Sequence, residues 1–393
     1  MITEVKRKAV LMEPKPRYVL YKAKRILNIH KHIDGGWFWS KYSAHPYVGC
    51  EHGCEYCYWR DEKYNMLARE NAARGLLDPF SQYIKVKENT PELLEKELSR
   101  VPKDVIVTGD YQPAEAKFLL SRRMLEVCLQ LGFPVLINEK SPLVLRDLDV
   151  IRRINRKTWA CVLWSIVNHK SQGYLERFEP RSPTIESRFA AMKKISEAGI
   201  PTGTAFMPIL PYICDNDENL EAVVKKTAQS GGSFVLAGSL TMSGAQASRY
   251  MQVLQKSYPH LTAKYDKLYR GGYSPDPEYS GEIARKVGRF CEKYKIADRM
   301  PRYILPGEGE TNKRISEKLF LDTYRMEVNC ESPRRVWAYR KAAWAIDELK
   351  ENVSAIYRRN GVKGLEKIQN IGKSMSKVIE EYLQEIENCR FSN

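Results

Sequence analysis

Three cysteines within eight residues are the part of this sequence best able to do chemistry. Cys50, Cys54 and Cys57 follow the spacing C-x3-C-x2-C. Thiolates are soft ligands that suit iron–sulfur clusters or zinc. A four-iron cluster is normally held by four ligands, so three thiolates would leave one iron with an open position. Gly49 and Gly53 allow the tight turns that would bring the three sulfurs together.

Two other interpretations of the cysteine loop remain open. A zinc site could use the three cysteines together with His52, but no second CxxC or HxxxH pair follows at zinc-finger spacing. Three structural cysteines without a shared role are also possible, because free cysteine is often buried. The spacing favours the cluster over both alternatives.

Composition indicates a globular protein of the cytoplasm that does not contact membranes. The chain has 393 residues, of which 43% are hydrophobic, and no run of eighteen apolar residues occurs. The N-terminal residues lack the apolar core of a signal peptide. Nine cysteines, an odd number scattered along the chain, argue against a disulfide framework and for a reducing compartment.

The charge balance points to an anionic partner. The formal net charge is +16 and the pI is about 9.3. Such a balance favours polyanions, with nucleic acid as the first candidate, although a generally basic proteome would give the same number. We therefore expect nucleic acid, and DNA in particular, as a partner.

Strands alternate with helices through the first 240 residues. This pattern predicts an α/β fold with parallel strands, an α/β barrel or part of one. In barrels of this kind the chemistry lies at the carboxyl ends of the strands. The expected strands are 105–110, 134–138, 160–166, 202–207 and 233–238, and the expected helices are 91–98, 121–131, 147–154, 187–198 and 217–230.

We expect four segments along the chain. Residues 1–44 form a basic extension that includes Lys6–Lys8, and the rings of residues 37–39 are expected to cover one end of the barrel as core. The barrel itself takes residues 45–245. A helical extension and linker follow over 246–330, and a small all-α domain over 331–393.

From residue 45 to about 240 the chain resembles the spore photoproduct lyase-like branch of radical S-adenosylmethionine (SAM) enzymes. The resemblance rests on the cysteine motif and on the segments 108–115, 139–141, 178–183 and 207–211. It implies a partial (β/α)6 barrel, a [4Fe-4S] cluster, SAM, and an external electron donor such as ferredoxin or flavodoxin. In this family SAM binds the open iron and is split to a 5′-deoxyadenosyl radical, which abstracts hydrogen from the substrate.

The resemblance also implies which residues contact SAM. Tyr56, just before the third cysteine, would lie against the adenine. Lys140 and Ser165 stand where the lyase has a lysine and a serine that contact SAM; a solvent-facing lysine and a core serine are the alternative. At the turn formed by Gly109 and Asp110, the carboxylate would accept a hydrogen bond from the amino group of SAM.

Two residues are candidates for a catalytic role. Tyr111 is expected to face the barrel mouth, where a tyrosine could relay a hydrogen atom, although packed tyrosines are the usual case. Cys214 follows a turn near the strand ends and is a candidate hydrogen donor. Thr108 occupies the place of the cysteine that returns hydrogen in the lyase, which argues against thymine-dimer reversal as the reaction.

Residues 365–379 resemble the helix–hairpin–helix unit at the amino end of X-family DNA polymerases. Such a hairpin points backbone N–H groups and the next helix N-terminus at a phosphate. Asn370 stands in place of the usual first glycine and tolerates a left-handed backbone. A small bundle for protein contacts is the alternative. The expected nucleic-acid contacts are Gly372, Lys373, Ser374 and Lys377.

Three functional hypotheses follow from these features. The first is a radical SAM enzyme acting on nucleic acid, in lesion repair or base modification. The second keeps the radical chemistry and has a peptide or small molecule as substrate. The third is a DNA-binding iron–sulfur protein without catalysis.

Overall fold

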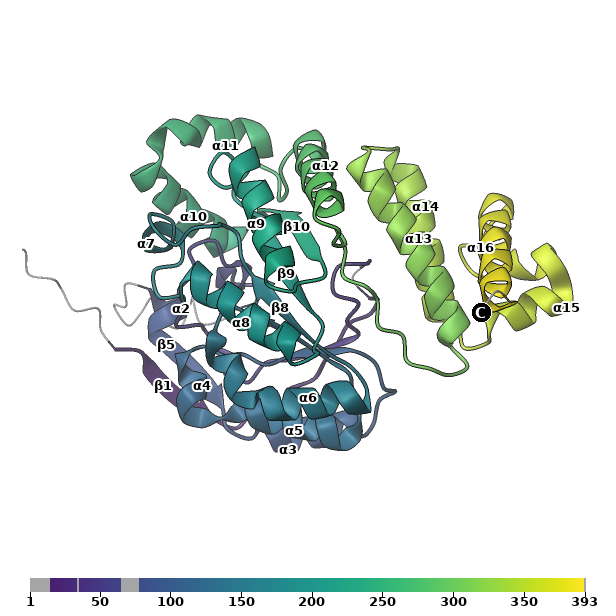
Figure 1. Cartoon of the computed structure of the whole chain (residues 1–393), viewed down its shortest axis with the longest axis horizontal. Helices are drawn as coiled ribbons and strands as arrows, with labels where there is room; N and C mark the ends of the chain where they lie inside the picture. The colour runs from purple at the N-terminus through teal and green to yellow at the C-terminus, as the bar shows by residue number, and fades with distance from the viewer. Residues whose placement is uncertain (1–14, 34, 65–77, 392–393) are drawn as a thin grey trace, which may run out of the picture.

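The computed structural model describes residues 15–33, 35–64 and 78–391 (Figure 1). Residues 1–14 of the expected basic extension, including Lys6–Lys8, lie outside the described residues. The division into four segments stays a prediction.

A sheet of seven strands forms the centre of the molecule. Its order is β10-β9-β8-β7-β6-β3-β2, and every pairing from β3 to β10 is parallel. Only β2 runs antiparallel to its neighbour. Six parallel strands confirm the predicted α/β class and the partial (β/α)6 barrel. The strands are β2 (Asn28–Ile29), β3 (Tyr42–Ala44), β6 (Ile106–Thr108), β7 (Val135–Glu139), β8 (Ala160–Ser165), β9 (Thr202–Ile209) and β10 (Val235–Ser239).

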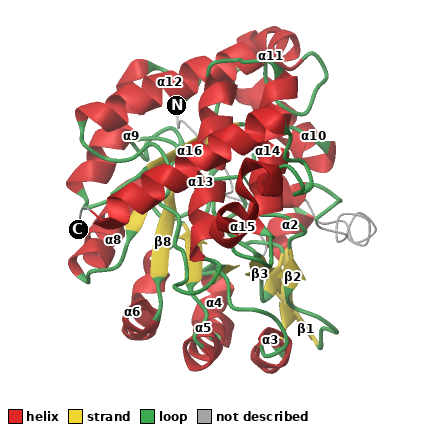
Figure 2. Cartoon of the chain, turned by 90° about the vertical axis from the view of Figure 1, so that its right-hand side faces the viewer, coloured by secondary structure: helices red, strands yellow, loops and turns green. Residues whose placement is uncertain are grey.

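Alternate strand residues of this sheet enter two different cores. Helices cover the sheet face that belongs to the first core. In β8, Val162 and Trp164 pack in the core that includes the helix residue Ile195, whereas Cys161 and Leu163 enter a second core. Figure 2 shows the helices around the strands. The covering helices are α3 (Thr90–Leu98), α5 (Leu120–Leu131), α6 (Leu148–Lys157), α8 (Ile185–Glu197) and α9 (Asp217–Gln229).

The beginning of α3 differs by one residue from the sequence-based expectation. The helix expected over 91–98 starts at Thr90, and Asn89 takes the N-cap position. The Thr90 hydroxyl donates to the carbonyl of Lys87.

A second sheet of three strands stands beside the barrel and was not predicted. Its order is β1-β5-β4, with β1 (Arg17–Tyr21) parallel to β5 (Tyr83–Lys87) and β4 (Tyr47–Val48) antiparallel to it. Strand β4 ends two residues before Cys50, so this sheet supports the cysteine loop.

Helices complete the C-terminal half of the chain. In the second core the Trp39 ring packs against Phe320 of α13, and its Nε1 donates to the Met300 carbonyl at 2.8 Å. The expectation that a ring of this segment is core is therefore confirmed for Trp39, which is 2% exposed. The helices are α10 (Gly244–Ser257), α11 (Thr262–Tyr269), α12 (Pro277–Lys293), α13 (Glu310–Val328), α14 (Pro333–Asp347), α15 (Val353–Leu365) and α16 (Lys373–Phe391).

Short helical turns link the larger elements. They are η1 (Tyr58–Arg60), α2 (Pro79–Gln82), α4 (Pro113–Phe118), η2 (Pro142–Asp147), α7 (Leu175–Phe178) and η3 (Pro259–Leu261). Within the described ranges, none of the helices has the length and apolar character needed to cross a membrane.

Candidate cofactor site at the strand ends

The cysteine loop connects β4 to η1 and contains two tight backbone turns. Backbone N–H groups of Gly53 and Cys57 donate to the carbonyls of Cys50 and Cys54 at 3.2 and 3.3 Å. Gly49 has a φ of 89°, and a Cβ there would come within 2.8 Å of a backbone oxygen. The loop therefore requires glycine at this position.

The three cysteines are free; Cys54 is buried, and Cys50 and Cys57 are half-buried. Burial first, and then the neighbouring thiols, raises the pKa of Cys50 well above its usual value and that of Cys57 to about 12. Burial also raises the pKa of Cys54. Thiolates in this place therefore need a cationic group beside them, and an iron–sulfur group meets that need. The donor set fits a cluster with three protein ligands.

The zinc alternative would need donors already close to one another. In residues 15–33, 35–64 and 78–391, no three His, Cys, Asp or Glu side chains are placed to hold a single metal ion. His52 is buried, with Nδ1 3.4 Å from the carbonyl oxygen of Arg181 and no hydrogen-bond partner for Nε2.

Arg60, which the sequence analysis missed, ties the loop to the fold. Its Nε and Nη2 donate to the carbonyls of Cys54 and Gly53 at 2.7 and 2.9 Å. Two further bonds, at 2.7 and 3.0 Å, join the guanidinium to the carboxylate of Asp78. A buried arginine three residues after the third cysteine was the available signal. Its effect is to hold the loop carbonyls so that the sulfurs keep their places.

Glu179 is the hub of the site. Its fully buried carboxylate accepts hydrogen bonds from Tyr56, Arg188, Lys140 (3.0 Å) and Tyr174 (3.4 Å), and Lys140 also donates to the Tyr56 hydroxyl at 2.9 Å. Burial alone would raise the pKa of Glu179, but Arg188 and Lys140 hold it well below its usual range. The structure thus brings together Tyr56 and Lys140, two of the residues expected to contact SAM.

The other expected SAM contacts lie at neighbouring strand ends. Ser165 ends β8, and its carbonyl accepts from Arg188 at 2.9 Å, which places it beside the hub. Gly109 follows β6 with a φ of 94°. The carboxylate of Asp110 lies 3.0 Å from Nδ1 of His45, a partner that the sequence analysis did not foresee.

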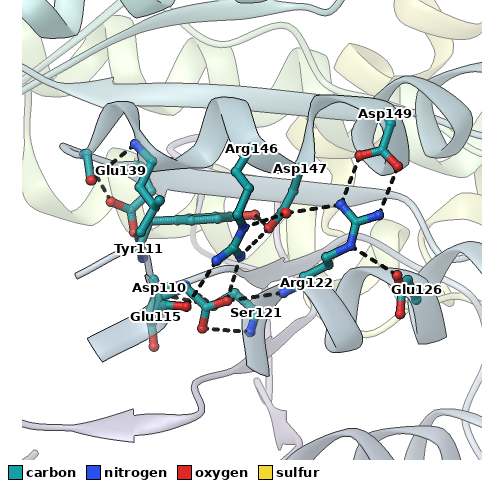
Figure 3. Close-up of polar contacts among 12 residues, drawn as sticks. Asp110, Tyr111, Glu115, Ser121, Arg122, Glu126, Glu139, Arg146, Asp147 and Asp149 are labelled. Atoms are coloured by element: carbon teal, nitrogen blue, oxygen red, sulfur yellow. Dashed lines mark hydrogen bonds and ion pairs between the residues drawn. The ribbon is translucent and has the colours of Figure 1, made fainter. Parts of the chain in front are cut away.

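Tyr111 is placed differently from the expectation that it faces the barrel mouth. Its ring is fully buried, and its hydroxyl donates to Asp147 at 3.0 Å (Figure 3). Its backbone N–H donates to Glu139 at 2.6 Å, and Glu139 also accepts from the N–H of Lys140 at 3.0 Å. Burial raises the pKa of Glu139 to about 7. The role of Tyr111 as a hydrogen relay stays a prediction.

A chain of ion pairs continues behind Tyr111 and fixes this wall of the site. Arg146 bridges Glu115 at 2.8 Å and Asp147 at 2.7 Å, and both carboxylates are fully buried (Figure 3). Arg122 adds a contact to Asp147 at 3.1 Å. Because each buried charge here has a partner, the turn that carries Asp110 has a rigid support.

Cys214 is fully buried beyond the end of β9. Its sulfur lies 3.8 Å from the amide nitrogen of Asn168, and burial raises the pKa of the thiol. The candidate role as hydrogen donor stays a prediction.

Asn138 is a further polar residue that the sequence analysis missed. It lies on β7, the middle strand of the sheet, and is exposed although Leu136 and Ile137 are fully buried. Solvent therefore reaches the sheet face that carries Asn138 two residues before Lys140. An asparagine beside an acidic residue at the end of an otherwise apolar strand was the available signal.

The C-terminal hairpin has the expected backbone. Asn370 adopts a φ of 66°, as its tolerance of the left-handed region predicted. Met375 and Ile379 are buried on one side of α16. The residues expected to contact phosphate are all exposed at its beginning: Gly372, Lys373, Ser374 and Lys377.

Comparison with known families decides the class of the protein. Residues 45–225 match the Radical SAM superfamily, and residues 311–387 match a helix-hairpin-helix domain. The chain belongs to the radical SAM superfamily. It is a radical SAM enzyme, and this membership implies an iron–sulfur cluster and SAM.

Relatives of this radical SAM enzyme occur in bacteria and archaea. An uncharacterized protein of Mycobacterium tuberculosis is 26% identical over 65% of this chain and 75% of its own length. One of Methanocaldococcus jannaschii is 30% identical over 52% of this chain and 72% of its own. A spore photoproduct lyase mutant with bound AdoMet and dinucleoside spore photoproduct shares the fold, with a TM-score of 0.51 at 17% identity over 72% of this chain and 82% of that one.

Proposed function

We propose that this enzyme holds a [4Fe-4S] cluster on Cys50, Cys54 and Cys57 and uses it with SAM to abstract hydrogen from a nucleic acid, in lesion repair or base modification. The observation that carries the substrate class is a helix-hairpin-helix domain, with an exposed helix start, joined to a radical SAM barrel. When bound, the cluster would supply the electron that splits SAM into methionine and a 5′-deoxyadenosyl radical. A ferredoxin or flavodoxin would deliver that electron to the cluster.

The residues around Glu179 orient SAM in this proposal. Lys140 is 14% exposed, and two of its three N–H groups donate to Tyr56 and Glu179. The third would bind the carboxylate of SAM, with the ammonium acting as a point charge. The ring of Tyr56 would support the adenine, because Glu179 fixes its hydroxyl. Ser165 and Asp110 would bond the polar groups of SAM from the neighbouring strand ends.

The reaction itself is proposed to differ from thymine-dimer reversal by the lyase's route. Thr108 is buried, and its hydroxyl donates to the carbonyl of Ala44 at 3.0 Å. A threonine hydroxyl cannot return a hydrogen atom to a product radical in the way that a cysteine thiol does. The product radical must therefore obtain a hydrogen atom elsewhere, and the thiol of Cys214 is the proposed donor.

Anaerobic reconstitution tests this proposal. The reduced protein is incubated with SAM and with irradiated or unirradiated DNA, and the products are analysed by mass spectrometry. We expect 5′-deoxyadenosine together with an altered nucleotide. 5′-Deoxyadenosine with no change in any DNA would contradict the nucleic-acid substrate and favour a peptide or small molecule.

Replacing Lys140 by methionine is expected to weaken SAM binding by roughly 10- to 100-fold. A hydrogen bond from a charged group contributes about 1.5–3 kcal/mol, and each 1.4 kcal/mol is a factor of ten. Equilibrium binding of SAM to the reconstituted protein measures the effect. Lys193→Met, on the exposed side of α8, is the matched control and should bind SAM as the wild type does. Equal affinities for the two variants would remove Lys140 from the SAM site.

Replacing Lys373 and Lys377 together by alanine is expected to weaken binding to every duplex sequence alike. If both contact phosphate, the slope of log K against log salt falls by about 2, since each phosphate contact contributes about 0.9. Fluorescence anisotropy over a salt series measures the slope. Lys341→Ala with Lys363→Ala, in the same helical domain, controls for net charge. A slope unchanged from the wild type would assign the hairpin to protein contacts.

A further inference from the structure

The segment around β1 carries exposed positive charges without acidic partners. Within residues 15–25 five cations are exposed, and none of them pairs with an acidic side chain of the described residues. We call them the β1 cation row: Lys15, Arg17, Lys22, Lys24 and Arg25.

β1 is one edge strand of the small sheet, and the opposite edge strand, β4, leads into the cysteine loop. β1 pairs with β5, and β5 pairs with β4, which leads to Cys50. Two strand spacings, about 10 Å, separate β1 from β4. The hydroxyl of Tyr18 on β1 donates to Glu51, the residue after Cys50, at 3.1 Å. The cation row is therefore structurally continuous with the proposed cluster site.

A further cation, Lys117 on α4, extends the row beside β1. Lys117 lies with its Nζ 5.3 Å from the centre of the Tyr18 ring and 5.1 Å from that of Phe118, and it is exposed. The surface thus combines cations with an aromatic ring, as grooves that follow a nucleic-acid backbone do.

The row is separate from the helix–hairpin–helix contact. Figure 1 places β1 on the opposite side of the barrel from α15 and α16. A duplex held only at the hairpin would therefore lie on the side of the barrel away from the cation row.

We propose that the β1 cation row binds the phosphate backbone of the nucleic-acid substrate and holds it next to the cluster loop. This inference rests on the proposed function. The charge complementarity between unpaired cations and a phosphate backbone carries it. Bases next to the bound phosphates would then lie on the side of the barrel where SAM is expected.

Cations on or beside an edge strand have another known use, because they prevent the strand from pairing with other chains. The two uses differ in what their removal changes. Loss of a phosphate contact lowers the slope of log K for DNA binding against log salt. Loss of edge protection causes aggregation and leaves this slope unchanged.

The test replaces Arg17, Lys22, Lys24 and Arg25 together by alanine in the full chain. Binding to a fluorescent duplex is measured by anisotropy between low and physiological salt. We expect the slope of log K against log salt to fall by about 2 to 4, because four cations contribute up to about 0.9 each. Formation of 5′-deoxyadenosine without DNA should stay at the wild-type rate, since SAM contacts are untouched.

A control variant has the same change in net charge at exposed cations elsewhere. It replaces two arginines and two lysines of α6, α8 and α9, which form no close ion pair in the described residues: Arg152, Arg153, Lys194 and Lys225. Its slope should fall by less than 1, because diffuse charge contributes less than direct contact.

Three outcomes would overturn the proposal. An unchanged slope in the β1 variant, with or without aggregation, assigns the row to edge protection alone. Equal losses in the β1 and control variants assign it to net charge. A wild-type protein that binds duplex without salt dependence removes the nucleic-acid substrate and this proposal together, while leaving SAM cleavage intact. If the fourfold variant fails to fold by circular dichroism, Lys22→Gln with Lys24→Gln, outside the strand, gives the same readout with an expected fall of about 1 to 2.

Discussion

Replacing Cys50, Cys54 or Cys57 singly by alanine is expected to abolish SAM cleavage and to remove most of the bound iron. Each sulfur is one of only three thiolates available to the proposed cluster, so loss of one leaves two ligands and exposes the cluster to solvent. Iron and sulfide analysis, absorbance near 400 nm and formation of 5′-deoxyadenosine measure the effect. We expect activity below about 1% of wild type, since electron transfer to SAM is the first chemical step.

Cys330→Ala serves as the matched control because Cys330 is exposed and far from the loop in sequence. It should retain iron and activity. Full iron content in any of the three loop variants would contradict the ligand assignment. Iron lost equally in the Cys330 variant would show that the assay reports general instability.

Replacing Glu179 by glutamine is expected to lower the free energy of unfolding by about 3–5 kcal/mol, the usual cost of leaving a buried charge without its partner. Glutamine keeps the shape of the side chain but removes the negative charge. Arg188 is fully buried and would lose its carboxylate, and Lys140 would lose one as well. Urea denaturation of the anaerobic protein without cluster measures the change, so that metal loss does not contribute.

The same carboxylate predicts a pH dependence with a definite sign. The folded-state pKa of Glu179 lies below that of the unfolded chain, so its contribution is present above about pH 4.3 and is lost as pH falls further. The wild type should therefore lose stability more steeply below this pH than the glutamine variant. Parallel curves for the two proteins would contradict the ion-pair account.

Glu197→Gln is the control for both measurements. Glu197 lies at the end of α8, and its side chain is 62% exposed. Exposed substitutions of this kind usually change stability by less than about 0.5 kcal/mol. A loss at Glu179 no larger than at Glu197 would mean that the hub does not hold the site together.

The strand–helix alternation and the cysteine spacing could be predicted from the sequence because both are local patterns. Strands β6 to β10 and helices α3, α5, α6, α8 and α9 lie within a few residues of their expected positions. Asn370 could be predicted as well, because its left-handed φ follows from a single residue's preference.

The hydrogen-bond partners of the site residues could not be predicted, because these partners come from distant parts of the chain. Glu179 meets Tyr56 across 123 positions in sequence, and Asp110 meets His45 across 65. The small sheet was missed because β4 has only two residues and β1 lies in a segment that was interpreted as a basic extension. Tyr111 was expected at the barrel mouth because sequence gives a strand end but not the direction of the side chain that follows it.

The measurement that tests the central claim most directly is formation of 5′-deoxyadenosine by the reduced, anaerobic protein reconstituted with iron and sulfide. We predict that it forms from SAM, that it requires all three loop cysteines, and that it increases when DNA is bound. A protein that carries its iron on these cysteines but leaves SAM intact under reducing conditions would contradict the account.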